Sequence, residues 1–228
     1  MIMQPLRKLF IVMMIIASTA CSNLLKQDEK QAITEIETAT SLEPSITWSS
    51  KAIELFNQGN QYLDNDVEKA AGYFNQAILI EPKMEAAYFN LLKLYFVSEK
   101  QVSENQTLES QVSEHSEKMQ QVFQKAEAEN ILSARILTLV GSKKRTQGQF
   151  NQAEKYYQLA LNKDANYLVA LANMAILQDL YLHNLVNAQD YYIQYQQQLV
   201  AQGKEDNRVV NWLADIKRRI AKVNKEKS

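Results

Sequence analysis

The stretch that decides the fold is ARILTLVGSKKRTQGQFNQAEKYYQLALNKDANY, residues 134–167. Each half repeats small and bulky residues at the spacing of one helical face: Leu137, Val140 and Gly141, then Ala153, Tyr157 and Ala160. Gly148 lies between the halves, where a glycine in the left-handed conformation can end one helix before the next begins. The stretch therefore predicts two helices joined by a tight turn.

The small residues have a mechanical reason to be there. Two antiparallel helices approach to about 8–10 Å only where the side chains between them are small. The unit resembles the tetratricopeptide repeat, which is 34 residues long and has a glycine within the first helix, a glycine at the turn, and an Ala, aromatic, Ala series in the second helix. One departure is Ala165, which stands where that family usually has the proline that stops the second helix.

The same register recurs on both sides of this unit. We predict a repeat domain over residues 48–205, and its helix pairs are expected at 48–82, 85–131, 134–167 and 168–201. A polar insertion at 98–116 extends the second pair, and a capping helix is expected over 206–224. Five glycines and three prolines in 228 residues leave little for a turn-rich β fold. The predicted fold is all-α, a TPR-type α-solenoid of about four helix pairs plus a C-terminal capping helix.

The first 20 residues have the order of a secretory signal. Arg7 and Lys8 precede an apolar run over residues 9–17, and small residues follow it. That run is too short to span a bilayer, which needs about 20 residues. Removing residues 1–20 leaves 23 basic against 26 acidic residues. No basic excess remains to suggest a nucleic-acid partner.

Cys21 is the only cysteine, so no intramolecular disulfide can form. Its position after Ala20 resembles a bacterial lipobox, although Ser18 stands where that family prefers a leucine-like residue. The resemblance implies acylation of Cys21, a lipid anchor and, from Ser22, sorting to the periplasmic face of the outer membrane. Residues 21–47 would then be the acylated cysteine and a flexible tether. A plain signal peptide with a coincidental cysteine, leaving a soluble periplasmic protein, is the alternative.

No constellation for catalysis, cofactor binding or metal binding is found in the sequence. His115 and His183 each lack a second metal ligand at helical spacing, and we expect both side chains to be solvated. The acidic turn Asp64-Asn65-Asp66 lacks the glycine and the bidentate glutamate of a calcium loop. No nucleophile elbow or glycine-rich phosphate loop is present. The sequence therefore predicts a protein without enzymatic activity, cofactor or metal.

Binding is the remaining function. Stacked helix pairs curve, and the first helices line the inner wall, which in the resembling family holds peptides or helices. The candidate partner-binding residues on that wall are Phe56, Asn57, Asn60, Phe89, Asn90, Lys93, Phe96, Arg135, Ser142, Arg145 and Asn173. Their amides can pair with a peptide backbone, and arginines can bind a carboxylate with two hydrogen bonds. Local packing is the competing explanation for the asparagines.

The function predicted is that of a membrane-anchored adaptor or scaffold binding a protein partner in an envelope assembly, such as pilus biogenesis, secretion or energy transduction. The alternative is a structural brace of an outer-membrane complex that binds no peptide, or a protein that self-associates through Tyr191, Tyr192 and Tyr195.

Overall fold

The computed structural model describes residues 47–104 and 109–226, without the side chains of residues 99–113. The described helices belong to one compact unit, Ile46–Ser228. The predicted signal, Cys21 and most of the tether lie outside the described residues. Within them, no helix has the length and apolar character needed to cross a membrane.

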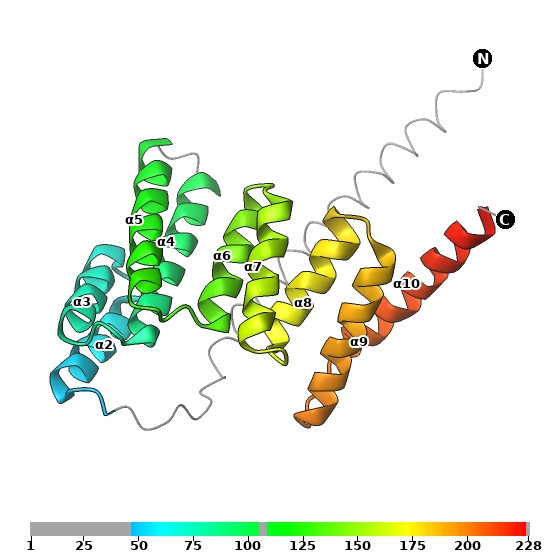
Figure 1. Cartoon of the computed structure of the whole chain (residues 1–228). Helices are drawn as coiled ribbons and strands as arrows, with labels where there is room; N and C mark the ends of the chain where they lie inside the picture. Colours follow the sequence, from blue (N-terminus) through cyan, green and yellow to red (C-terminus); the bar gives the residue numbers. More distant parts are fainter. Residues whose placement is uncertain (1–46, 105–108, 227–228) are drawn as a thin grey trace, which may run out of the picture. The chain divides into compact units, whose positions relative to one another are not determined.

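Helices follow one another in antiparallel pairs along the unit (Figure 1). In chain order they are α2 (Ser50–Tyr62), α3 (Val67–Ile80), α4 (Glu85–Glu104), α5 (Glu109–Ala128), α6 (Ala134–Thr146), α7 (Phe150–Lys163), α8 (Leu168–Ile176), the π-helix η1 (Leu177–Tyr181), α9 (Leu185–Ala201) and α10 (Asn207–Glu226). No strand occurs in the described residues. The predicted all-α solenoid of helix pairs with a final helix is confirmed.

Two glycines set how closely the helices of a pair approach. A Cβ atom added at Gly59 on α2 would lie 2.6 Å from Cε1 of Phe74 on α3. A Cβ atom added at Gly141 on α6 would lie 2.6 Å from Cε1 of Tyr157 on α7. Both rings are completely buried. In each pair, a large aromatic ring of the second helix therefore packs directly on a glycine of the first helix, as the 34-residue pattern predicts.

Local polar groups define where the helices begin and end. The Ser133 hydroxyl accepts a hydrogen bond of 3.3 Å from the Ile136 backbone and caps α6. Gly148 has a φ of 72°, so α6 ends at the left-handed glycine that the sequence indicates. At the end of α7, the Asp164 carboxylate accepts a 2.9 Å hydrogen bond from the Asn166 backbone. This turn ends the second helix, as the proline usually found at the position of Ala165 would.

The first helices α4, α6 and α8 pack directly on one another. Contacts join α4 to α6 and α6 to α8, whereas the second helices α3, α5, α7 and α9 make no comparable contact among themselves in the described part of the chain. Closer spacing on one side curves a row of helix pairs toward that side. The first helices α4, α6 and α8 therefore form the inner side of the row, and a side-chain hydrogen bond between Asn90 and Asn60 joins α2 to α4 on the same side.

The polar insertion lies in the second pair. Residues 98–104 continue α4, and residues 109–116 belong to α5, so each of these helices has 20 residues. The neighbouring α6 and α7 have 13 and 14 residues. Helix length in this pair thus takes up part of the insertion.

The last helix changes one sequence prediction. Tyr192 and Tyr195 on α9 were expected to be available for self-association, but only 2% and 3% of their surfaces are exposed. Their rings lie in the core formed with α8 and α10, and the Tyr192 ring is 5.3 Å from the Trp212 ring. Tyr191 is half-buried and donates a hydrogen bond to Gln158. The expected tyrosine surface is wrong because α10 covers two of its three members.

Candidate protein-binding surface

The predicted wall residues differ in how much of each side chain remains accessible. Asn57 is exposed. The half-buried group is Phe56, Asn60, Asn90, Lys93, Phe96, Arg135 and Ser142. The buried group is Phe89, Arg145 and Asn173, with 2%, 8% and 4% of their surfaces exposed. The accessible members therefore concentrate on α2 and α4, toward the N-terminal end of the row.

A pair of asparagines joins the first two repeats on this wall. The Asn90 side-chain amide on α4 donates a 2.7 Å hydrogen bond to the Asn60 side-chain oxygen on α2. Each amide uses one group in this bond and has further donor or acceptor capacity. Phe56, one turn before Asn60, lies with its ring 5.7 Å from the Phe74 ring. The two helices thus present amides beside a partly accessible aromatic surface.

Cations of α6 lie over aromatic rings of the neighbouring first helices. The guanidinium of Arg135 is 4.6 Å from the ring centre of Phe89, and the Lys143 ammonium is 5.9 Å from that of Phe96. On the other side of α6, the Arg145 guanidinium is 5.8 Å from the ring centre of Tyr181 in η1. Such contacts contribute about 0.5–1 kcal/mol at exposed sites and more when desolvated. The aromatic wall residues therefore also hold the repeats together.

Sequence reasoning missed Lys143 and Tyr181. Lys143 directly follows the predicted wall residue Ser142 on α6, and only 6% of its surface is exposed. Tyr181 ends the π-helix, whose wider turn has no signature in the sequence pattern. The available signal was the run Lys143-Lys144-Arg145 in the last turn of α6, where cations are favourable.

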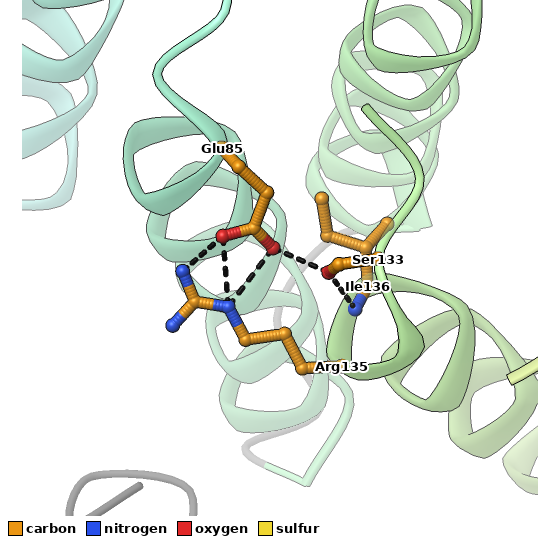
Figure 2. Close-up of polar contacts among 4 residues, drawn as sticks. All are labelled: Glu85, Ser133, Arg135 and Ile136. Carbon is orange, nitrogen blue, oxygen red and sulfur yellow. Dashed lines mark hydrogen bonds and ion pairs between the residues drawn. The ribbon is translucent and has the colours of Figure 1, made fainter. Parts of the chain in front are cut away.

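Arg135 is occupied by an internal ion pair. Its guanidinium Nε donates to both carboxylate oxygens of Glu85 at 2.9 Å, and its Nη2 also donates to that carboxylate (Figure 2). The same carboxylate accepts from the Ser133 hydroxyl, which caps α6. Burial beside these groups, with the Glu85 charge adding to it, raises the pKa of Tyr167 to about 12. Arg135 therefore positions α6 against α4.

We predict a measurable stability loss for Glu85→Ala. The change removes the acceptor shared by Arg135 and Ser133, and hydrogen bonds to charged groups contribute about 1.5–3 kcal/mol when buried. Because the side chains of Glu85 and Arg135 are 23% and 31% exposed, we expect a smaller decrease of about 1 kcal/mol in the free energy of unfolding.

Equilibrium urea unfolding measures this decrease. Glu54→Ala is the matched control, since the Glu54 carboxylate pairs with Lys51 at 3.0 Å while both side chains are more than half exposed. We expect a change within about 0.5 kcal/mol for the control. Equal losses in the two variants would contradict a positioning role for the Glu85 carboxylate.

Two further wall residues make local hydrogen bonds. The Asn173 amide donates a 2.8 Å hydrogen bond to the Val169 carbonyl one turn earlier in α8. The Ser142 hydroxyl lies 3.2 Å from the Tyr157 hydroxyl, within the glycine-centred contact of α6 and α7. Their placement agrees with the local packing explanation.

The two histidines differ from each other. His183 is exposed in a turn with a φ of 54°, as expected for a solvated side chain. His115 on α5 is half-buried and stacks 5.9 Å from the Tyr95 ring, so the expectation of a solvated His115 is wrong. The lengthened α4 and α5 bring these rings together. Among the described residues, no group of three or more His, Cys, Asp or Glu side chains is placed to hold a metal ion.

Comparisons with known proteins give structural likenesses at low sequence identity. No protein-family model matches the chain. No curated protein matches it either. Similar solved structures include YrrB, a TPR protein described as having an unusual peptide-binding site, at 15% identity, covering 78% of this chain and 92% of that one with a TM-score of 0.43.

Two other similar structures are those of PilF and PilW. PilF of Pseudomonas aeruginosa is 19% identical, covering 78% of this chain and 86% of that one, with a TM-score of 0.40. PilW, a type IV pilus biogenesis factor, is 18% identical, covering 66% and 79%, with a TM-score of 0.38. Likenesses at this level carry no functional argument. The paired helices, the Gly59 and Gly141 contacts and the curved row of first helices make this chain an all-α solenoid of the tetratricopeptide type.

Proposed function

We propose that the chain is a protein-binding adaptor whose contact surface is the inner side of α2 and α4. The observation that carries the proposal is the accessible set on these adjoining helices: Phe56, Asn57, Asn60, Asn90, Lys93 and Phe96. The hydrogen bond between Asn60 and Asn90 keeps α2 and α4 side by side, so a partner segment could contact both helices at once.

The chemistry of this surface suits a peptide or a helix of another protein. Amides donate to and accept from a peptide backbone whatever its sequence. The partly exposed rings of Phe56 and Phe96 offer apolar area to a bulky side chain. Arg135, Arg145 and Asn173 are assigned a positioning role in this proposal, because their contacts within the chain already use them.

The experiment compares paired substitutions of accessible side chains. Asn57→Ala with Lys93→Glu alters the proposed surface, and Gln76→Ala with Lys125→Glu is the matched control on the second helices α3 and α5. A photo-crosslinking residue at position 57 of the otherwise unchanged chain first captures the partner. The first variant, which carries no crosslinker, should then retain this partner about tenfold less, which corresponds to about 1.4 kcal/mol of binding free energy. Unchanged retention by the first variant, or equal loss in the control, would exclude the inner side of α2 and α4.

We further propose that the adaptor is anchored by acylated Cys21 at the periplasmic face of the outer membrane and serves an envelope assembly, such as pilus biogenesis, secretion or energy transduction. The signal-like residues 1–20 and the lipobox-like position of Cys21 support this. Fractionation of Cys21→Ala tests the anchor, since this variant should leave the membrane fraction. Its retention there would remove the support for acylation.

A further inference from the structure

The final helix α10 repeats the register of a first helix. On α6, the buried residues Ile136, Val140 and Lys143 recur at a 3–4 spacing, and on α10 the residues Val209, Leu213 and Ile216 recur at the same spacing with 1%, 7% and 0% of their surfaces exposed. The α10 set lies in the core shared with α8 and α9. With this alignment, each position on α10 has a known counterpart on α6.

The adjacent face of the two helices differs. On α6, Leu137 and Gly141 are buried, and Gly141 receives the Tyr157 ring of the second helix α7. Their counterparts on α10 are Val210 and Ala214, and Val210 is 53% exposed while Ala214 is also exposed. Among the described helices, α10 packs on α9 and on no other to a comparable extent (Figure 1). The face that receives a second helix in α6 is therefore uncovered in α10.

Basic side chains border this uncovered face. Lys217 and Arg218 are exposed one turn after Ala214, and Lys222 follows one turn later. Arg218 pairs with Asp215 at 3.1 Å, while both side chains are largely in water. A second copy docking through the same face would bring these cations together, which is unfavourable. An acidic partner would instead be attracted.

We infer that the face of α10 formed by Val210, Ala214 and Lys217 is a docking site for an acidic amphipathic helix of another protein. The helix would take the place of the missing second helix, with a bulky apolar residue over Ala214 and carboxylates near Lys217 and Arg218. This site is separate from the inner side of α2 and α4, so it stands or fails independently of the proposed function.

The probe is a peptide with the sequence of α7, the second helix that packs on the equivalent face of α6. Residues 150–163 form α7, and a peptide of this sequence keeps the Tyr157 ring that packs on Gly141. Stapling positions 155 and 159, which are exposed in the fold, offsets the instability of a short helix in water. Asn151→Glu and Gln152→Glu make the peptide acidic in its first turn, which an antiparallel arrangement with Tyr157 over Ala214 places toward Lys217 and Arg218, and the stapled peptide without these two changes is its control.

Binding to the purified full chain is measured by fluorescence anisotropy. We expect saturable binding of the acidic peptide, at least about tenfold tighter than that of its control. Lys217→Glu with Arg218→Glu should weaken it at least about tenfold, whereas the matched reversal Lys155→Glu with Lys163→Glu on the exposed side of α7 should not. Ala214→Arg should also weaken it, although this change adds a positive charge, because a long side chain blocks close approach of a helix.

Three results would overturn the inference. The first is no saturable binding of the acidic peptide at about 1 mM. The second is unchanged or tighter binding to Ala214→Arg, which would mean attraction by charge without helix packing. The third is loss of binding in Asn57→Ala with Lys93→Glu, which would place the peptide on the inner side of α2 and α4.

Discussion

Tyr192→Ala is expected to lower the free energy of unfolding by about 3–5 kcal/mol, the largest effect among the substitutions considered. The Tyr192 ring is 2% exposed, lies in the core shared by α8, α9 and α10, and is 5.3 Å from the Trp212 ring. Truncation would leave a cavity at the base of the last helix, which packs mainly on α9. We therefore expect α10 to open before the rest of the array.

Urea unfolding measures the total loss, and amide hydrogen exchange over residues 207–226 measures the opening of α10. The matched control is Tyr191→Ala, one residue earlier on the same helix. Tyr191 is half-buried, and its hydroxyl donates one exposed hydrogen bond to Gln158, so we expect a loss of about 1 kcal/mol or less. A similar loss for both tyrosines would mean that Tyr192 is not the residue that α10 covers.

Gly141→Ala is expected to destabilise the chain by about 2 kcal/mol. The new Cβ would lie 2.6 and 2.7 Å from two carbons of the Tyr157 ring, which is completely buried and cannot swing into open space. Alanine favours a helix over glycine by about 1 kcal/mol, and that gain is too small to offset the forced separation of α6 and α7.

Gly72→Ala separates the two effects. Gly72 lies inside α3, and a Cβ added there meets nothing within 4 Å. The helix preference then acts alone and should raise the free energy of unfolding by about 0.5–1 kcal/mol. The midpoints of thermal unfolding should therefore move in opposite directions for the two glycines, and a shift in the same direction would contradict the steric account of Gly141.

The sequence does not predict which polar wall residues remain accessible in the structure. Their positions along each helix follow from the repeat, but Asn173 and Arg135 find partners within the chain, while Asn57 remains exposed. Which of these occurs depends on the neighbouring repeat, because Glu85 reaches Arg135 across 50 residues of sequence. No pattern within one 34-residue unit contains that information.

The sequence by itself determined the helix pairs, the turn at Gly148 and the close contacts at Gly59 and Gly141, since backbone conformation and side-chain size act locally. Only the tertiary structure decided that Tyr192 is covered and that Val210 is uncovered, because both depend on how α10 lies on α9. Burial is a property of neighbours that are distant in sequence, and the stacking of one pair on the next is what brings them together.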